Sequence, residues 1–215
     1  MILIPVKNLA SAKQRLAAIL DQPTRTELAQ AMLLDVLETL AGWPHCPEVG
    51  IVTSDPFAVQ LAQKFRFTVI ADTNNRSETD AIEIATRYCE SHSIDNSLVI
   101  PGDIPLIQSW ELEEILAAAP AEGSVLVPAA DRRGTNAIWR RPASLFSARF
   151  GNDSFKPHHA AALATGKPCV VISLPGIALD VDNPSDLHTL ATTPGETRTQ
   201  RLVRQLADLP LAANE

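Results

Sequence analysis

The chain has 215 residues, of which 46% are hydrophobic, so it is long enough for one large domain and too apolar to be disordered. Lys and Arg number 18 against 25 Asp and Glu, and the net charge of −7 disfavours general binding to nucleic acid or to a membrane. The start of the chain, MILIPVKNL, lacks the features of a signal peptide, and no apolar run approaches a membrane span. Three distant cysteines without C-x-x-C spacing predict reduced thiols and a cytoplasmic protein.

Apolar runs alternate with amphipathic segments along the first half of the chain. The runs rich in β-formers predict strands at 1–6, 49–53, 68–71 and 97–101. The amphipathic segments predict helices at 24–40, about 56–65, 80–91 and 109–118. The first of these has the spacing of a capping box, Thr24 with Glu27, and Ser109 is the expected cap of the last.

The second half predicts shorter and more closely spaced elements. We expect strands at 124–128, 137–140 and 169–174, a helix at 154–165, and a short helix capped by Asn183 with Pro184 in its first turn. The segment 197–209 has the apolar spacing of an amphipathic helix. It can pack on the domain or on a partner subunit, so a homodimer is kept open.

The alternation of elements indicates the fold class. Strand–helix–strand units predict an α/β protein: a single domain of three layers around a mostly parallel sheet, with one antiparallel addition after residue 123. The main domain is expected at 1–190, and 191–215 are expected to form a linker and the C-terminal helix.

Three carboxylates follow apolar strands. Asp103 comes after the predicted strand 97–101, and Asp180 and Asp182 come just past the strand at 169–174. Ligands of an open parallel sheet bind outside the carboxyl ends of its strands, and both side chains of an extended D-x-D segment point to one face. Together the three predict a site for a hard cation such as Mg²⁺. For either motif alone, a loop or cap role is the commoner explanation.

A basic loop, PVKNLASAKQRLA, follows the first strand. This is where the phosphates of a nucleotide usually bind in an α/β sheet, so Lys7, Lys13 and Arg15 are candidates for neutralising a triphosphate. The Gly-rich spacings of a Walker loop and of a Rossmann fingerprint are both missing. The alternative is a solvated basic helix face.

Two further segments carry small polar residues next to glycine. Gly134 permits close approach of a ligand to the backbone, and Thr135 and Asn136 offer hydrogen-bonding groups. Gly151 and Ser154 stand at an apparent helix start, where free N–H groups bind anions. A simple N-cap role for Ser154 is compatible with this.

Six segments of the chain, in this order, resemble the 2-phospho-L-lactate guanylyltransferase family of deazaflavin coenzyme F-420 biosynthesis: PVKNLASAKQRLA, MLLDVLETL, VIPGDIPLI, GTNAIW, FGNDSFKPHH and LDVDNPSDL. The resemblance implies a fold of the nucleotide-diphospho-sugar transferase type, GTP as donor and Mg²⁺ as metal. It also implies a small phosphorylated three-carbon acid as acceptor: 2-phospholactate, phosphoenolpyruvate or 3-phosphoglycerate. A downstream transferase that consumes a labile product is a further implied partner.

The resemblance assigns roles to matching positions. It implies a catalytic metal set, a donor-phosphate set and an acceptor set: Asp103, Asp180 and Asp182; Lys7, Lys13 and Arg15; and Thr135, Gly151 and Ser154, beside Asn136. Two positions depart from the family's pattern. Arg133 stands where a Gly is usual, and we place it with the acceptor set. Thr79-Asp80 stands where a Leu-Asn pair is usual, and we keep Asp80 with the donor set.

Other residues and other functions stay open. His158 matches a family position and is a candidate for a phosphate contact, whereas His159 is expected to be structural, and Asp55 to cap a helix. The competing functions are a cytidylyl- or sugar-nucleotidyltransferase, a metal-dependent glycosyltransferase, and a non-catalytic nucleotide-binding or scaffold protein. A glycosyltransferase would release a nucleoside diphosphate, whereas a nucleotidyltransferase would release pyrophosphate.

Overall fold

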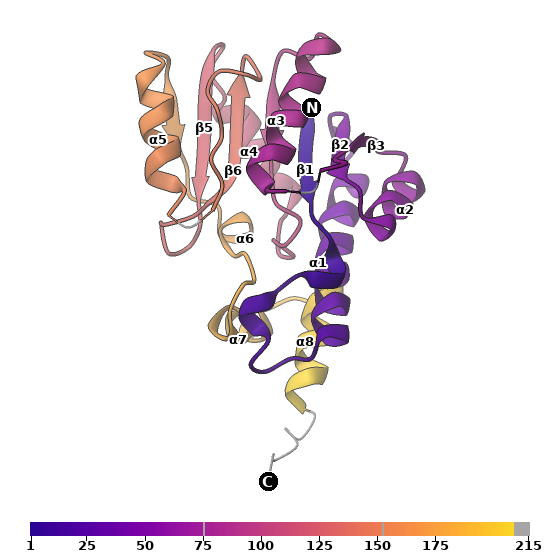
Figure 1. Cartoon of the computed structure of the whole chain (residues 1–215). Helices are drawn as coiled ribbons and strands as arrows, with labels where there is room; N and C mark the ends of the chain where they lie inside the picture. The colour runs from indigo at the N-terminus through magenta and orange to yellow at the C-terminus, as the bar shows by residue number, and fades with distance from the viewer. Residues whose placement is uncertain (75, 152, 209–215) are drawn as a thin grey trace.

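A seven-stranded sheet runs through the centre of the molecule in the order β3-β2-β1-β4-β6-β5-β7 (Figure 1). The computed structural model describes residues 1–74, 76–151 and 153–208. The strands are β1 (Ile2–Val6), β2 (Val49–Thr53), β3 (Thr68–Ala71), β4 (Ser97–Val99), β5 (Gly123–Pro128), β6 (Thr135–Arg141) and β7 (Cys169–Val171). All pairs are parallel except the two that include β6. The predicted mostly parallel sheet with one antiparallel strand is therefore confirmed.

Helices cover both faces of the sheet, which confirms the three-layer α/β fold. Side chains of α1 (Gln22–Gly42), α2 (Pro56–Phe65) and α4 (Ser109–Ala118) join one apolar core. Those of α3 (Glu78–Ser91) and α5 (Phe155–Ala164) join a second core on the other face. Neighbouring residues of one strand enter different cores because successive side chains of a strand point to opposite faces. Leu98, for example, belongs to the first core and Val99 to the second.

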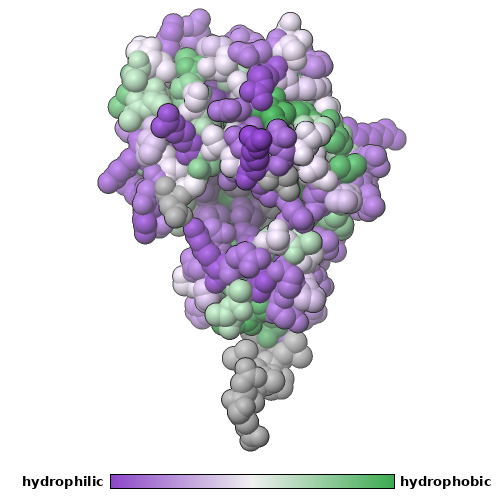
Figure 2. Space-filling view, in the orientation of Figure 1, coloured by the Kyte–Doolittle hydropathy of each residue, from purple (hydrophilic) through white to green (hydrophobic). Residues whose placement is uncertain are grey.

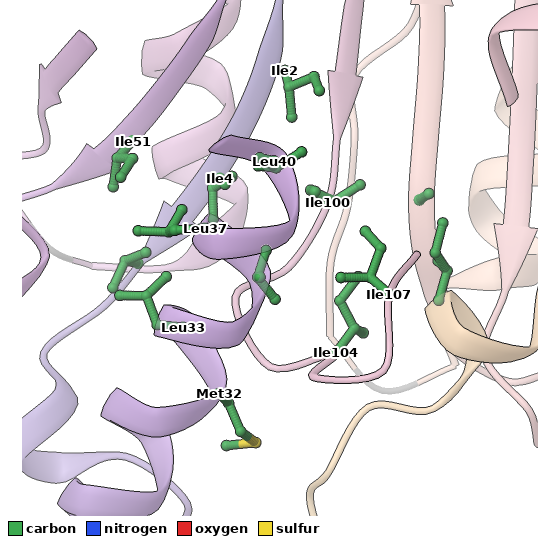
Figure 3. Packing of buried hydrophobic residues seen from close by; sticks show 14 of the residues in the cluster. Ile2, Ile4, Met32, Leu33, Leu37, Leu40, Ile51, Ile100, Ile104 and Ile107 are labelled. Carbon is green, nitrogen blue, oxygen red and sulfur yellow. The ribbon is translucent and has the colours of Figure 1, made fainter. Parts of the chain in front are cut away.

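The first core fixes β1 against α1. Leu33, Leu37 and Leu40 of α1 are at most 1% exposed, and they pack with Ile4 and Ile51 of the sheet (Figure 3). Burial of each such side chain contributes roughly 1.5–3 kcal/mol. The loop between β1 and α1 is consequently held at both ends. It contains two short 3-10 helices, η1 (Leu9–Ser11) and η2 (Gln14–Leu16).

Helix starts correct the predicted caps in two places. The N-cap of α1 is Asp21, which accepts a hydrogen bond from the Thr24 N–H, so the predicted Thr24 capping box is wrong. The helix begins earlier because Pro23 is compatible with a first turn. Likewise Gln108, not Ser109, is the N-cap of α4. The predicted Asn183 cap of α7 (Pro184–Thr192) is confirmed.

Three helices follow β7 in the described residues. They are α6 (Pro175–Ala178), α7 and α8 (Arg198–Asp208), and the last packs on α1 and α7 (Figure 1). Asp35 of α1 accepts hydrogen bonds from the backbone N–H groups of Arg198 and Thr199. The amphipathic tail thus packs on its own domain, although residues 209–215 lie outside the described part. The expected boundary at residue 190 falls within α7. None of the helices in the described ranges is both long and apolar enough to cross a membrane.

Candidate active site

A pocket of about 960 Å³ opens at the edge of the sheet where β1 and β4 end and β6 begins. Figure 2 shows the hollow, lined largely by hydrophilic residues, between the sheet and the part of the molecule below it. Its size is at the upper end of that of small-molecule sites. Among the lining residues are all of the predicted site residues except Asp80: Lys7, Lys13, Arg15, Asp103, Arg133, Thr135, Asn136, Gly151, Ser154, Asp180 and Asp182.

Lys13 lies at the centre of the charged end of the pocket. Its Nζ donates to Asp103 Oδ2 at 2.6 Å and to Asp182 Oδ1 at 3.0 Å, and its side chain is only 6% exposed. Burial by itself lowers the pKa of Lys13, but the charges of Asp103 and Asp182 outweigh burial and raise it. Arg15 binds the other oxygen of Asp182 at 3.0 Å and is 60% exposed. Lys13 therefore stays charged and holds two distant segments together.

Asp180 and Asp182 reach the pocket by a different route from the one predicted. They do not follow β7 directly, because α6 lies between that strand and the D-x-D segment. The buried Glu111 carboxylate accepts from the Gly176 N–H at 2.7 Å and so anchors α6. Asn136 Nδ2 donates to the carbonyl of Ala178 and to Asp180 Oδ1. The segment is thus fixed by hydrogen bonds from one helix, α4, and one strand, β6.

The two aspartates of the D-x-D segment differ in their electrostatic environment. Burial, and then the charge of Asp103, raises the pKa of Asp180. Lys13 and Arg15 overcome the effect of burial at Asp182 and lower its pKa. Negative charge therefore accumulates around Asp180, whereas it is neutralised around Asp182.

Glu78 is a fourth carboxylate of the pocket, and sequence reasoning missed it. It is the first residue of α3 and lines the pocket beside the aspartates. Burial, and then the charges of Asp103 and Asp182, raises the pKa of Glu78 to about 8. A signal for it is present in the sequence: Glu78 stands at the start of a helix that follows a strand of the parallel sheet. Such a position lies at the sheet edge where Asp103 is also expected.

The carboxylates of the pocket are chemically suited to bind a hard cation. Carboxylate oxygens are the ligands of Mg²⁺, and burial together with the charges of Asp103 and Asp182 raises the pKa of Asp180. A cation, the Lys13 ammonium, already lies between Asp103 and Asp182. In the described residues, however, no three His, Cys, Asp or Glu side chains converge as a metal site. The metal assignment of Asp103, Asp180 and Asp182 stays a prediction.

The start of the basic loop is held by buried acidic groups. Asp55 Oδ2 accepts from the Leu9 N–H, while its Oδ1 accepts from the Phe57 and Ala58 N–H groups of α2. Its predicted cap role is confirmed, and the contact with Leu9 was not foreseen. Lys7 Nζ lies 3.9 Å from the carboxylate of the buried Asp72. Lys7 thus lies beside Asp72, the residue that follows β3.

The opposite end of the pocket is built from neutral hydrogen bonds. The Thr135 N–H donates to Ser154 Oγ at 3.1 Å, and Thr135 Oγ1 lies 3.0 Å from His158 Nδ1. All three residues are at most 5% exposed. Ser154 precedes α5, but its side chain makes no cap bond to that helix. Its hydroxyl is used to join the start of β6 to the start of α5.

Gly151 and Arg133 lie at the mouth of this end. Gly151 has a φ of +134°, which other residues rarely adopt, and a Cβ there would meet no atom of the described residues within 4 Å. The glycine is therefore explained by its backbone conformation; a close approach of ligand stays a prediction. Arg133 Nε and Nη2 donate to both oxygens of Asp153. Both side chains are more than half exposed.

Three remaining candidates lie away from the pocket wall. Asp80 is in the first turn of α3, where its N–H donates to the Ser77 cap. His158 is 1% exposed and bonds Thr135 and the Arg149 N–H, so it contacts the pocket only through Thr135. His159 stacks on Phe155, as expected of a structural residue.

Comparison with known sequences gives a consistent result. The family model described as "Guanylyl transferase CofC like" matches residues 1–209. A phosphoenolpyruvate guanylyltransferase of Roseiflexus castenholzii is 34% identical over 203 residues, covering 94% of this chain and 93% of the relative. One from Mycolicibacterium paratuberculosis is 33% identical over 189 residues, covering 86% of this chain and 84% of the relative.

Comparison with solved structures agrees on the fold. A protein of Desulfovibrio desulfuricans G20 described as a nucleotide-diphospho-sugar transferase has a TM-score of 0.76 and 18% identity, covering 95% of this chain and 93% of that one. A CMP:2-keto-3-deoxy-manno-octonic acid synthetase has a TM-score of 0.58 and 16% identity, covering 88% and 95%. At these identities the likeness establishes the nucleotide-diphospho-sugar transferase fold, as expected from the sequence.

Proposed function

The chain belongs to the CofC-like guanylyl transferase family and is a nucleotidyltransferase; from that premise we propose that it moves GMP from GTP onto the phosphate of a small three-carbon phospho-acid. The observation that carries the proposal is the division of one pocket into two ends. At the charged end, here called the donor end, Lys13 and Arg15 lie against acidic residues. At the neutral end, here called the acceptor end, Thr135 and Ser154 contribute their hydroxyls. A triphosphate needs the first, and a compact anionic acceptor fits the second.

The reaction needs positioning and charge neutralisation more than a protein nucleophile. A phosphate oxygen of the acceptor attacks the α-phosphorus of GTP in line. The new bond joins that oxygen to phosphorus, the bond from the α-phosphorus to the bridging oxygen breaks, and pyrophosphate leaves with its electrons. Lys13 and Arg15 bind the triphosphate and offset the charge that develops on the leaving group. Thr135 and Ser154 hold the acceptor on the opposite side.

Magnesium is part of the proposal. Asp103, Asp180 and Asp182 would hold it, since their oxygens suit a hard cation and the carboxylate of Asp103 acts on Asp180 with like charge. When bound, the ion supplies neutralisation of phosphate charge. Lys13 occupies the space between Asp103 and Asp182, so it would turn from these carboxylates toward the triphosphate. Glu78, whose pKa is raised to about 8, is mostly protonated at neutral pH and would offer a further carboxylate once a cation is bound.

The acceptor is proposed as phosphoenolpyruvate, 2-phospholactate or 3-phosphoglycerate. Support for the first comes from the relatives named for phosphoenolpyruvate, which match most of the chain. Arg133 adds a forked cation at the acceptor end, a group that suits carboxylates and phosphates. A role in coenzyme F-420 biosynthesis follows if one of these acids is the acceptor, and the product then requires a downstream transferase. The free thiols of Cys46, Cys89 and Cys169 support a reducing, cytoplasmic setting.

One experiment tests the function. The protein is incubated with GTP, Mg²⁺ and each of the three acids, with mass spectrometry of the adduct and measurement of released pyrophosphate. We expect an adduct with at least one acid and one pyrophosphate per adduct. Matched incubations with CTP and with the Asp103→Asn variant serve as controls. Transfer from CTP alone would favour a cytidylyltransferase, nucleoside diphosphate release a glycosyltransferase, and binding of GTP without turnover a non-catalytic protein.

A further inference from the structure

His158 is a deeply buried titratable group beside the acceptor end, and the reaction as described does not use it. Its side chain is 1% exposed, yet both ring nitrogens have partners. Nε2 accepts from the Arg149 N–H at 2.7 Å, and Nδ1 lies 3.0 Å from Thr135 Oγ1. The ring thus joins the loop that leads to Gly151 to the residue that begins β6.

These contacts determine where the ring proton is. A backbone N–H can only donate, so Nε2 must carry a lone pair. Burial, and then the positive charge of Arg140, lowers the pKa of His158 to about 4, so the ring is neutral at neutral pH. A neutral imidazole has one protonated nitrogen, which must be Nδ1. Nδ1 therefore donates to Thr135 Oγ1.

The two hydroxyls of the pocket wall also have defined hydrogen-bond directions. Thr135 Oγ1 accepts from His158, and Ser154 Oγ accepts from the Thr135 N–H. Each oxygen is supplied with a donor from the protein side. A hydroxyl has one proton of its own, and it is the proton that each can offer to a ligand.

We propose that His158 is a positioning residue that, by donating to Thr135 Oγ1, directs the Thr135 hydroxyl proton toward an oxyanion of the acceptor. This deepens the proposed function by naming what the neutral end recognises: an unprotonated carboxylate or phosphate oxygen. A chain of donors, Arg149 N–H to His158 to Thr135, ends on the ligand. Chains of this kind polarise one another, which strengthens the last bond.

The two amides nearest to histidine in shape separate the two ring contacts. In His158→Asn the amide lies at the position of Nδ1 and can still donate to Thr135. In His158→Gln it lies near the position of Nε2 and serves the Arg149 N–H instead. The neighbouring His159→Gln is the matched control, because His159 stacks on Phe155 and does not line the pocket. Melting temperatures show whether each variant is folded.

The kinetic readout is the KM for the acceptor acid against the KM for GTP. We expect His158→Gln to raise the acceptor KM about tenfold, as loss of a bond to a charged ligand does, with the GTP KM within about twofold. His158→Asn and His159→Gln should stay close to wild type. Adding His158→Gln to Thr135→Val should have little further effect, since the histidine acts through that hydroxyl. Equal changes in both KM values, or additive effects, would overturn the proposal.

A second readout does not depend on turnover or on the variants folding. The ¹⁵N shifts of the His158 ring in the wild-type protein report which nitrogen carries the proton. We expect a neutral ring protonated at Nδ1 throughout pH 6 to 8, well above the lowered pKa. A proton on Nε2 would overturn the proposal even if all kinetics agreed. Absence of transfer to every acid would instead refute the guanylyltransferase function, and the spectrum would still decide the proton arrangement.

Discussion

The two ends of the pocket are held by different forces. At the donor end, Lys13 lies between Asp103 and Asp182, and burial, followed by the charges of nearby carboxylates, raises the pKa of Asp180 and Glu78. At the acceptor end, neutral hydrogen bonds among buried groups fix Thr135 and Ser154. A cluster of charges is rearranged by any ligand that brings charge of its own, whereas buried neutral bonds are costly to break. The donor end is therefore the adaptable part of the site and the acceptor end the preorganised part.

The largest effect should come from removing charge at the donor end. Asp103→Asn and Asp182→Asn each keep the side-chain shape but lose a carboxylate. We expect kcat/KM to fall at least about 100-fold, since each tenfold loss is only about 1.4 kcal/mol of barrier. Steady-state kinetics with GTP and the best acid provide the measurement, and Asp95→Asn, at a surface pair with Arg141, is the control. Activity within about threefold of wild type in both variants would end the assignment.

Replacing Lys13 should weaken GTP binding, because its ammonium is expected to turn to the triphosphate. We expect Lys13→Gln to raise the dissociation constant of GTP about 10- to 100-fold, as loss of a charge-assisted contact does. GMP, which lacks the β- and γ-phosphates, should be affected much less. Arg15→Gln should show a smaller, salt-sensitive effect because Arg15 is 60% exposed. Calorimetric titration with both nucleotides measures the difference, and an equal loss for GTP and GMP would move Lys13 away from the triphosphate.

The sequence predicted the layers and most of the pocket wall because both depend on local pattern. Apolar strands and amphipathic helices identify the sheet, and Asp103 and Thr135 lie within a few residues of strand ends at its edge. The route to Asp180 was not predictable. The strand predicted at 169–174 leaves residues 175–179 without an assigned element, whereas in the structure Glu111, 65 residues from Gly176 in sequence, binds Gly176 and stabilises a helical turn.

Long-range contacts also explain the other differences. The pKa of Glu78 is raised by burial and then by carboxylates from two distant segments, and no spacing in the sequence brings these groups together. His158 was considered for a phosphate contact from its motif, but burial places it behind Thr135. Family resemblance indicated segments that the structure brings together in one pocket. The roles of individual side chains within them required their neighbours in space.

A smaller effect should appear in stability against pH. The pKa of Glu78 is raised from 4.5 to about 8 in the folded protein, so folding favours its protonated form. Its contribution is fully present below the unfolded pKa and is lost as pH rises through 8. Metal-free wild type should therefore lose stability from pH 5 to 9, and Glu78→Gln should lose less. We expect melting temperatures to diverge by at least about 3 °C at pH 9, the shift that about 1 kcal/mol produces at this size. Parallel curves would contradict the raised pKa.

The smallest and most selective effect concerns Arg133, which either binds the acceptor acid or only forms an ion pair with Asp153. In the structure its guanidinium binds Asp153, and both side chains are more than half exposed, so the pair should add little stability. If Arg133 binds the acceptor acid, Arg133→Gly should change the ratio of kcat/KM values among phosphoenolpyruvate, 2-phospholactate and 3-phosphoglycerate. Asp153→Asn, which frees the guanidinium without removing it, is the matched variant and should leave Arg133 more available to the acid. The two changes should therefore shift the ratio in opposite directions. Identical shifts would mean that the pair only ties the segment before β6 to the one before α5, and an unchanged ratio in both would leave selection of the acid to the buried hydroxyls of Thr135 and Ser154.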